Sequence, residues 1–370
     1  MNQKIGTVVF DLAPSAGNPR NSEGAFLKLK DGRILFAYSR YTGDSGNDDA
    51  AACIAGRWSN DDGRTWSDEQ VLASPDEHQA MNIMSVSLMR MANGDIGLFY
   101  LIRHGWHDTR LHLRRSSDEG KTWGEAICCL PAPGYFVTNN DRVIRLSSGR
   151  LLVPAAYHRM RGESKTHWHS FDSRGTGYFF YSDDDGKTWQ EARNPVVLDE
   201  PGTRRGLLEP GVIELKDGTI WSWHRTDLGR QYESFSLDGG ETWSKPSVSV
   251  FSSPDSPLSM KRLPSGELFA VWNPIPNYQT RNPAPMTNGR TPLVGSISKD
   301  EGKTWGNWLY FETEEDKNGC CYTAIYFTEE AMLLGYCAGT EADNGCLNRL
   351  RIRRIEWKEL QSVYPELQLA

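Results

Sequence analysis

Apolar and polar residues alternate in short runs along the chain, and tight polar turns that end in glycine interrupt these runs. Asp-Gly, Asn-Gly and Ser-Gly between alternating apolar residues predict β-hairpins, because such turns need a residue at positive φ. Helical periodicity is nearly absent. The predicted hairpins are LKLKDGRILFAY around Gly32, LMRMANGDIGLFY around Gly94, VIRLSSGRLLVPA around Gly149, VIELKDGTIWSW around Gly218, MKRLPSGELFAVW around Gly266 and a degenerate sixth copy, AIYFTEEAMLLGY, at 324–336.

A second repeat interleaves with the hairpins, and it has the pattern S-x-D-x-G-x-T-W. Its Asp and Ser side chains can accept hydrogen bonds from turn amides, its Gly adopts conformations that other residues resist, and its Trp can pack between strands. A single catalytic site does not need five equivalent copies, so we interpret the repeat as a structural turn. Each copy is called a box below. The copies are Ser59–Trp66, Ser116–Trp123, Ser182–Trp189, Ser236–Trp243 and Ser298–Trp305.

The order of the repeats predicts the architecture. Each unit reads as hairpin, loop, strand, box and strand, which gives four strands in about 60 residues. Six hairpins then predict an all-β, six-bladed propeller of four-stranded blades, with the boxes in the turns between third and fourth strands. The last unit lacks its fourth strand, and the run KIGTVVFDL at 4–12 can supply it and close the ring. We expect a single domain over 1–370.

Composition limits the classes of molecule that the protein is expected to bind. A net charge of −7 argues against nucleic acid or an anionic membrane surface as partner. The N-terminus lacks a signal-peptide pattern, and no apolar run approaches membrane-spanning length. Seven cysteines, including two adjacent pairs and no CxxC, indicate reduced thiols. We therefore expect a cytoplasmic protein.

The five boxes at this spacing resemble the Asp-box, or BNR, repeats of the sialidase (neuraminidase) superfamily, and the resemblance covers nearly the whole chain. It implies a six-bladed propeller with a carbohydrate pocket on its axis. The innermost strand of each blade should line that pocket near its start, nine or ten residues before each hairpin glycine. These positions are Ser22-Glu23, Met84-Ser85, Asn139-Asn140, Leu208-Glu209, Ser256-Pro257 and, by analogy, Tyr322.

The resemblance also implies a chemistry. Sialidases use a tyrosine nucleophile made more basic by a glutamate, an aspartic acid on a loop, and arginines for the substrate carboxylate. Tyr322 in GCCYTAIYF resembles the nucleophile, and Glu209 in LLEPGVIELKDG resembles the glutamate. Asp48 or Asp49, shortly before the first box, resembles the acid, and spacing does not separate the two. Two further positions resemble family arginines: Arg230 in GRQYESFSLDGGETW and Arg290 in NGRTPLVGSISKDEGKTW.

The chain departs from the family pattern at the first inner strand. The family's first arginine is replaced by Ser22-Glu23-Gly24, with Arg20 two residues earlier. A glutamate there repels a substrate carboxylate. Cys337 stands where a glutamate is common. The departures indicate a sialidase frame with changed specificity, for a neutral sugar, a uronic acid or another nonulosonic acid. Amide and charged residues also replace small ones in the third unit: Asn140, Asp141 and Arg142.

Histidines on the loops that enter the predicted pocket are further candidates. We include His104, His107 and His158 among substrate-binding residues, together with Ser85. His167 and His169 join them as conceivable metal ligands, but no third ligand has suitable spacing. No metal or cofactor is expected.

Three functional hypotheses remain. The first is an exo-acting glycoside hydrolase in which Tyr322 attacks, Glu209 takes its proton, and Asp48 or Asp49 acts as acid and then base. The second is a polysaccharide lyase that eliminates across a uronic acid. The third is a non-catalytic, lectin-like carbohydrate-binding propeller. The partner in each case is a glycan; the oligomeric state is left open.

Overall fold

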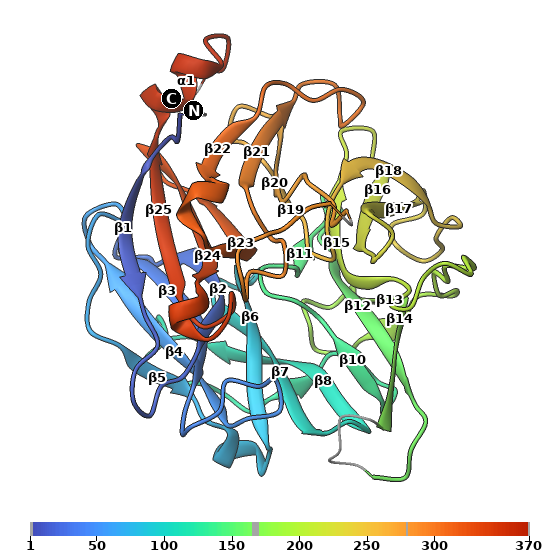
Figure 1. Ribbon diagram of the computed structural model, residues 1–370. Helices are drawn as coiled ribbons and strands as arrows, with labels where there is room; N and C mark the ends of the chain where they lie inside the picture. The colour runs from blue at the N-terminus through green and yellow to red at the C-terminus, as the bar shows by residue number, and fades with distance from the viewer. Residues whose placement is uncertain (1–2, 165–169, 279, 369–370) are drawn as a thin grey trace.

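The computed structural model describes residues 3–164, 170–278 and 280–368, and it is built almost wholly from β-strands that surround a common centre (Figure 1). The described strands form five sheets. The first contains β2 (Asn21–Lys28), β3 (Ile34–Tyr41), β4 (Ala52–Ser59) and β5 (Gln70–Ala73). The third contains β15 (Leu208–Glu214), β16 (Ile220–Arg225), β17 (Arg230–Ser236) and β18 (Ser247–Ser252). The fourth contains β19 (Ser259–Arg262), β20 (Leu268–Trp272), β21 (Leu293–Ser298) and β22 (Leu309–Glu312).

The second sheet is larger than the repeats predict. It contains nine strands because β10 pairs with β8 in parallel through Tyr135 and Thr109, which joins two sets of strands. The Thr109 amide donates to the carbonyl of Gly134 at the same junction. The nine strands are β6 (Asn82–Arg90), β7 (Ile96–Gly105), β8 (Asp108–Ser116), β9 (Ile127–Cys128), β10 (Tyr135–Val137), β11 (Ile144–Arg145), β12 (Leu151–Met160), β13 (Phe171–Ser182) and β14 (Gln190–Glu191).

The fifth sheet joins the two ends of the chain. It contains β23 (Gly319–Phe327), β24 (Ala331–Gly339), β25 (Leu350–Glu356) and the N-terminal strand β1 (Thr7–Leu12). β1 runs antiparallel to β25, from the pair Thr7–Arg354 to the pair Leu12–Leu350, with a bulge between Val8 and Phe10. The predicted pairing of the N-terminal run with the last strand is therefore present, and the two termini lie together in Figure 1.

Helical structure is confined to short segments. Among the described residues, no helix has the length and apolar character needed to cross a bilayer. The segments are the single turns η1 (Pro75–His78), η3 (Glu314–Asp316) and η4 (Glu341–Asp343), and the helix α1 (Trp357–Val363).

The predicted hairpins are confirmed, and their glycines explain the turn geometry. Between β2 and β3, the Leu29 amide donates to Arg33 and the Gly32 amide donates back to Leu29. Gly32 has φ of 91°, which suits glycine because it has no Cβ. The equivalent turns at Gly94, Gly149, Gly218 and Gly266 repeat this pattern with φ between 85° and 105°.

The boxes are hydrogen-bonded turns, as the sequence predicts. In the turn between β17 and β18, Asp238 Oδ1 accepts from Ser236 Oγ at 2.8 Å and from the Thr242 amide at 2.9 Å. Its Oδ2 accepts from Thr242 Oγ1 at 2.6 Å. Trp243 then stacks on Phe179 of β13 with ring centroids 3.6 Å apart. The turn therefore fixes a tryptophan that packs against the neighbouring sheet.

Apolar side chains fill the space between adjacent sheets. Ala25, Leu35 and Ile54 of the first sheet are buried against Ile83 and Leu98 of the second. Similar clusters lie between the second and third, third and fourth, fourth and fifth, and fifth and first sheets. This arrangement brings the innermost strands to the centre, where the candidate site lies.

The box turn gives a direct test of its structural role. We expect Asp238→Ala to lower the free energy of unfolding by about 1–3 kcal/mol, because one carboxylate satisfies several donors of the turn. Leu237→Ala is the matched control: Leu237 is 84% exposed, and its truncation should leave stability unchanged. Denaturant unfolding checks both variants, and equal stability of Asp238→Ala and the parent would contradict a structural role.

Candidate active site

Each of four inner strands carries one residue with positive φ at a break in its pairing register. Glu23 on β2 has φ of 56° and Ser85 on β6 has φ of 60°. Glu209 on β15 has φ of 46° and Tyr322 on β23 has φ of 57°. Non-glycine residues rarely adopt this conformation, and a bulge re-aims the side chain that carries it. These residues are among the sequence-predicted positions near the starts of the inner strands.

The sequence explains why the chain can bulge there. A Cβ on Gly24 would lie 2.3 Å from the Phe36 ring, and one on Gly211 would lie 2.2 Å from the Trp223 ring. Glycine beside each bulge lets the aromatic ring of the second strand approach the inner strand closely. In the fourth sheet, Pro257 occupies the corresponding position and cannot adopt positive φ.

Tyr322 and Glu209 meet although 113 residues separate them in the chain. Tyr322 Oη donates to Glu209 Oε1 at 2.8 Å. Arg225 at the end of β16 donates from Nη1 to Glu209 Oε1 at 2.8 Å and approaches Tyr322 Oη at 3.3 Å. All three side chains are buried, with 5–9% of each residue exposed. A phenol, a carboxylate and a guanidinium therefore form one contact group.

The phenol is protonated in this resting arrangement. Burial raises the pKa of Tyr322 well above its ordinary value, and the neighbouring Glu209 adds to the rise, while Arg225 and Arg290 oppose it. The phenolate can therefore form only if a nearby base takes the proton. Glu209 Oε1 already accepts that hydrogen bond, and Glu209 Oε2 makes none to the described residues.

Arg225 stands in the same loop sequence, HRTDLGR, as Arg230, but only Arg230 was predicted as a site residue. Arg225 lies between two carboxylates, with Nε 2.5 Å from Asp255 Oδ1 and Nη1 on Glu209. Desolvation raises the pKa of Asp255, but the contact with Arg225 and the charges of Arg205 and Arg290 together outweigh it, so the pKa is lowered. Arg230, the predicted arginine, is exposed on β17 and is not brought to the group. The sequence signal for Arg225 is its place at the end of the apolar run IWSWHR, which is buried in the structure. Spacing from the fourth box instead points to Arg230, which lies on the surface.

Arg290 lies beside the tyrosine as the sequence predicts. Its guanidinium lies 5.5 Å from the centroid of the Tyr322 ring. Nη1 contacts Cys321 Sγ at 3.0 Å and Nη2 contacts the carbonyl of Asp255 at 3.3 Å. Nε has no hydrogen-bond partner among the described residues, although Arg290 is only 5% exposed. A buried guanidinium with a free N–H can bind an acceptor group of a ligand.

A second cluster, from the first sheet, faces this group. Arg20 Nη1 contacts Asp48 Oδ1 at 2.6 Å, and Arg20 Nη2 contacts Glu23 Oε2 at 3.3 Å. The structure therefore distinguishes the two loop aspartates, because Asp48 and not Asp49 pairs with Arg20. Ser22 Oγ contacts Glu23 Oε2 at 3.4 Å, and the buried Ser85 donates its backbone amide to Ser39 Oγ at 2.9 Å. Arg20 also lies over the Tyr41 ring at 4.5 Å.

An aromatic wall with a buried arginine lies on the second sheet. Arg103 lies 4.7 Å from the Trp106 ring and 5.2 Å from the Tyr135 ring, and only 2% of it is exposed. Its Nε and Nη1 lack hydrogen-bond partners among the described residues. Phe171 stacks on Trp106 and meets Tyr135 edge to face. Arg103 was not predicted as a site residue, since nothing in the stretch LIRHGWHDTR distinguishes it from Arg110, which pairs with Asp108.

The three candidate histidines differ in environment. His158 is buried beside Tyr135, and its Nδ1 lies 2.9 Å from the carbonyl of Asp172. A carbonyl only accepts, so Nδ1 carries the proton and Nε2 is an acceptor. Burial lowers the pKa of His158 to about 4, which keeps the ring neutral.

The other two candidates lie at the end of β7 and in the turn between β7 and β8. His104 contacts the carbonyl of His78 and, at 3.3 Å, Asp108. His107 is half-buried. His167 and His169 lie outside the described residues. In the described part of the chain, no group of three His, Cys, Asp or Glu side chains could hold a metal ion.

Asn140, Asp141 and Arg142 connect the inner strands to one another. Asn140 Nδ2 donates to the carbonyls of both Gly24 and Tyr322, at 2.8 and 3.1 Å. Asp141 accepts from Lys261 and from the Ile325 amide. Arg142 donates to the Leu258 carbonyl at 2.6 Å. These three candidate substrate-binding residues are thus engaged by the protein, and Asn140 ties the β2 and β23 bulges together.

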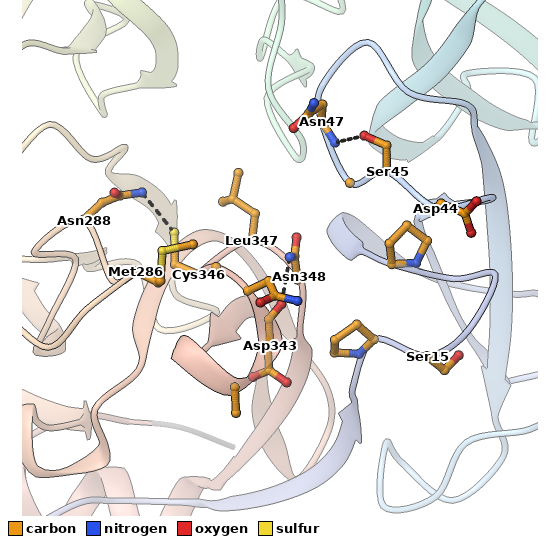
Figure 2. Close-up of a pocket in the computed structure, with 16 residues that line it drawn as sticks. Ser15, Asp44, Ser45, Asn47, Met286, Asn288, Asp343, Cys346, Leu347 and Asn348 are labelled. Carbon is orange, nitrogen blue, oxygen red and sulfur yellow. Dashed lines mark hydrogen bonds between the residues drawn. The ribbon is translucent and has the colours of Figure 1, made fainter.

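A cavity of about 730 Å³ opens next to the first-sheet cluster (Figure 2). Its lining comes from 14–19, 44–47, 286–288 and 342–348, and it does not include Glu209 or Tyr322. Figure 2 shows Asn288 and Cys346 on one side and Asp44 and Asn47 on the other. The carbonyl of Gly46, in this lining, accepts from Arg20 Nη1 at 3.1 Å. The cavity therefore adjoins the carboxylate cluster.

Comparison with known proteins identifies the family. Residues 32–336 match the BNR repeat-like domain, and the chain belongs to this family. The anhydrosialidase of Macrobdella decora is 30% identical over 147 residues, which cover 36% of this chain and only 16% of that protein.

Solved structures share the fold at low identity. A protein of unknown function from Dyadobacter fermentans superposes with a TM-score of 0.69 at 18% identity, covering 95% of this chain and 99% of that one. The leech intramolecular trans-sialidase complexed with 2,7-anhydro-Neu5Ac gives 0.71 at 14% identity, covering 97% and 71%. The intramolecular trans-sialidase of Ruminococcus gnavus gives 0.70 at 14%, covering 95% and 97%. These similarities establish a sialidase-like fold.

The buried arginine bridge gives a stability prediction. We expect Arg225→Met to lower the free energy of unfolding by about 3–5 kcal/mol, because it leaves two carboxyls without their cation. The loss should shrink as pH falls through 3.8, the ordinary pKa of Asp255, because protonation removes the unpaired charge.

Arg230→Met removes an exposed arginine five residues away and should change stability little. Urea unfolding at several pH values compares the two variants. Equal losses in both would refute the inferred role of the bridge.

Proposed function

We propose that this protein is an exo-acting glycoside hydrolase of the sialidase type, in which Tyr322 attacks the anomeric carbon of a terminal sugar. The observation that carries the proposal is the buried 2.8 Å hydrogen bond from Tyr322 to Glu209. Tyrosine becomes a competent nucleophile when a carboxylate takes its proton, and here the carboxylate is in contact. The sialidase-like fold supports this choice of reaction class.

The reaction proceeds in two balanced steps. Tyr322 Oη gives its proton to Glu209 and bonds to the anomeric carbon, while the bond to the leaving oxygen breaks and an acid protonates that oxygen. Water then attacks the anomeric carbon, giving a proton to the conjugate base of that acid. The tyrosine leaves and takes its proton back from Glu209. Asp48, Asp49 and Glu23, all from the first sheet or its loop, are the available carboxyls for the acid.

The N–H groups of the site that have no hydrogen-bond partner in the protein favour an oxygen-rich or anionic sugar as ligand. Arg290 and Arg103 have N–H groups without partners among the described residues. A carboxylate or several hydroxyls of a sugar can satisfy them. Arg225 differs, because Glu209 and Asp255 already neutralise it. The substrate class we propose is therefore a terminal uronic, nonulosonic or polyhydroxylated sugar on a glycan.

We assign the cavity of Figure 2 to the leaving part of the glycan. Gly46 in its lining accepts from Arg20, which also contacts Asp48, and the amide side chains of the lining can bind hydroxyl groups. A cytoplasmic protein would meet short imported glycans rather than polymers, and this location remains part of the proposal. Nucleic acid and membranes are not among the proposed partners.

We further propose that the five sheets are six blades of one propeller domain over 1–370, with Asp boxes between their third and fourth strands. The nine-stranded sheet would divide between β8 and β10, which a single residue pair joins. β1 would close the ring by completing the last blade.

One observation favours a second candidate, elimination across a uronic acid. His158 is neutral, and its Nε2 is an acceptor on the same wall as Tyr135. A neutral imidazole can remove the proton next to a carboxylate. The product would be unsaturated and would absorb in the ultraviolet, whereas hydrolysis gives a reducing sugar without this absorbance.

A panel of aryl glycosides, including sialic acid and uronic acid donors, tests the proposal. We expect Tyr322→Phe to lower kcat roughly 10³–10⁶-fold and to abolish covalent labelling by a fluorinated donor of the hydrolysed sugar. We expect Glu209→Gln to lower kcat about 10²–10⁴-fold. Tyr326→Phe, on the same strand but packed on Phe26, is the matched control and should retain activity.

Unchanged turnover in Tyr322→Phe would exclude the tyrosine as nucleophile. Glycan binding by the parent with no turnover of any donor would instead favour a lectin-like propeller.

A further inference from the structure

Two carboxyls, those of Glu23 and Asp48, share a single buried arginine. Arg20 is only 2% exposed, and its short contact of 2.6 Å goes to Asp48, whereas its contact to Glu23 is 3.3 Å. One guanidinium neutralises one carboxylate, and two ionised carboxylates at the same cation repel each other. The cluster therefore favours one ionised and one protonated carboxyl.

Asp48 is the carboxyl that is suited to stay ionised. It has the shorter contact to Arg20, and its side chain is 57% exposed. Desolvation raises the pKa of Asp48, but the contact with Arg20 and the charges of Arg103 and Arg290 together outweigh it and lower the pKa. A carboxyl with a lowered pKa holds no proton near neutral pH and is a poor general acid.

Glu23 is the carboxyl that is suited to keep a proton. It is 3% exposed, and it sits at the β2 bulge, at the same step of its strand as Glu209 and Tyr322 on theirs. Burial, with Asp48 and Glu209 adding to it, raises the pKa of Glu23 to about 7, against the opposing effects of Arg20 and the Ser85 hydroxyl.

The backbone fixes Glu23 near the nucleophile. The side-chain amide of Asn140 donates both to the carbonyl of Gly24, the residue after Glu23, and to the carbonyl of Tyr322. One amide nitrogen thus holds the two bulges side by side at the centre of the molecule. The electrostatic effect of Glu209 on Glu23 agrees with this proximity.

We propose that Glu23, and not Asp48, gives the proton to the leaving oxygen, and that Asp48 and Arg20 hold it in place. This inference rests on the proposed glycosidase function. In the first step, the O–H bond of Glu23 breaks, the proton goes to the leaving oxygen, and the C–O electron pair stays on that oxygen. In the second step, the Glu23 carboxylate takes a proton from the attacking water and is restored.

The proposal explains the main departure from the sialidase pattern. A glutamate replaces an arginine at this strand, which costs the site a cation for the substrate carboxylate. In return, the site gains a buried carboxyl on a strand that Asn140 ties to the strand of the nucleophile. Protonated Glu23 also removes the charge repulsion that an ionised glutamate would exert on an anionic sugar.

Leaving-group dependence tests the proposal, because a good leaving group needs no acid. For the sugar that the aryl glycoside panel identifies, the methyl glycoside and the 2,4-dinitrophenyl glycoside are compared. We expect Glu23→Gln to lose about 10²–10⁴-fold in kcat/KM on the methyl glycoside and less than about tenfold on the dinitrophenyl glycoside. The fall of kcat/KM above about pH 7, where Glu23 loses its proton, should also disappear in this variant.

Two matched variants separate the roles. Removing Asp48 leaves Arg20 to Glu23 alone and lowers the pKa of Glu23. At a pH low enough to keep Glu23 protonated, Asp48→Asn should keep the difference between the two leaving groups small, whereas Glu23→Gln should enlarge it. Glu233→Gln removes another glutamate whose pKa burial raises to about 7, on β17 away from the cluster, and should behave as the parent does. An enlarged difference in Asp48→Asn at that low pH, or a parent-like difference in Glu23→Gln, would overturn the proposal while leaving the glycosidase function intact.

An infrared titration checks the protonation without any substrate. In Glu233→Gln, which lacks the other glutamate with a pKa of about 7, the carbonyl stretch of a protonated carboxylic acid should titrate near pH 7. The titration should move to lower pH when Asp48→Asn is added, because Asp48 raises the pKa of Glu23, and the stretch should be lost when Glu23→Gln is added. Absence of the stretch from Glu233→Gln would overturn the proposal even if the Glu23→Gln variants failed to fold. If the parent protein hydrolyses no glycoside of the panel, the proposed glycosidase function itself is contradicted.

Discussion

A single left-handed residue near the start of an inner strand decides where a central side chain points. At Glu23, Ser85, Glu209 and Tyr322, the strand departs from regular pairing for one step. A non-glycine residue in this conformation costs about 1–3 kcal/mol, so each bulge must be held by its surroundings. The hydrogen bonds from Ser85 to Ser39 and from Asn140 to two bulged strands provide that restraint. The packed sheets thus make the unusual backbone possible, and the backbone brings four distant residues to one point.

Charge balance is the second constraint on the centre. Arg225 neutralises Glu209 and Asp255, and Arg20 faces Glu23 and Asp48. Because no pair of charges can be buried without desolvation cost, each arginine is held by nearby acceptors. Arg290, beside Tyr322, and Arg103, beside Trp106 and Tyr135, each have N–H groups without hydrogen-bond partners among the described residues. Arg290 and Arg103 thus keep N–H donors for a ligand, whereas Arg225 and Arg20 pair with carboxylates of the protein itself.

Most of the strands and turns could be predicted from the sequence, because the motifs that form them are local and repeated. Hairpin glycines such as Gly32 and box residues such as Asp238 act within a few positions, so periodic counting finds them. Counting back from the hairpin glycines also found Glu23, Ser85 and Glu209, since the first strand of each unit has nearly constant length. The parallel junction between Tyr135 and Thr109 has no such signal, because two residues from different units form it.

The site was only partly readable, because its contacts depend on how loops return to the centre. Arg225 and Arg103 were not predicted as site residues: each lies near the end of a buried strand, and only the folded chain shows which side it faces. The choice between Asp48 and Asp49 likewise depends on Arg20, 28 positions before Asp48. Arg230 has the expected spacing from its box and is nevertheless exposed. Spacing locates a strand, but burial and pairing decide the use of each side chain.

The pairing of β1 with β25 has a consequence for how the molecule is made. Residues 7–12 emerge from the ribosome before residues 350–356, so β1 has no partner strand until β25 has been made. During that time β1 is an unpaired strand that can pair with other chains. Contacts of such long sequence separation also slow folding, because the two segments must meet before the pairing stabilises anything. Of the described strands, the one that is synthesised first must therefore wait longest for its partner.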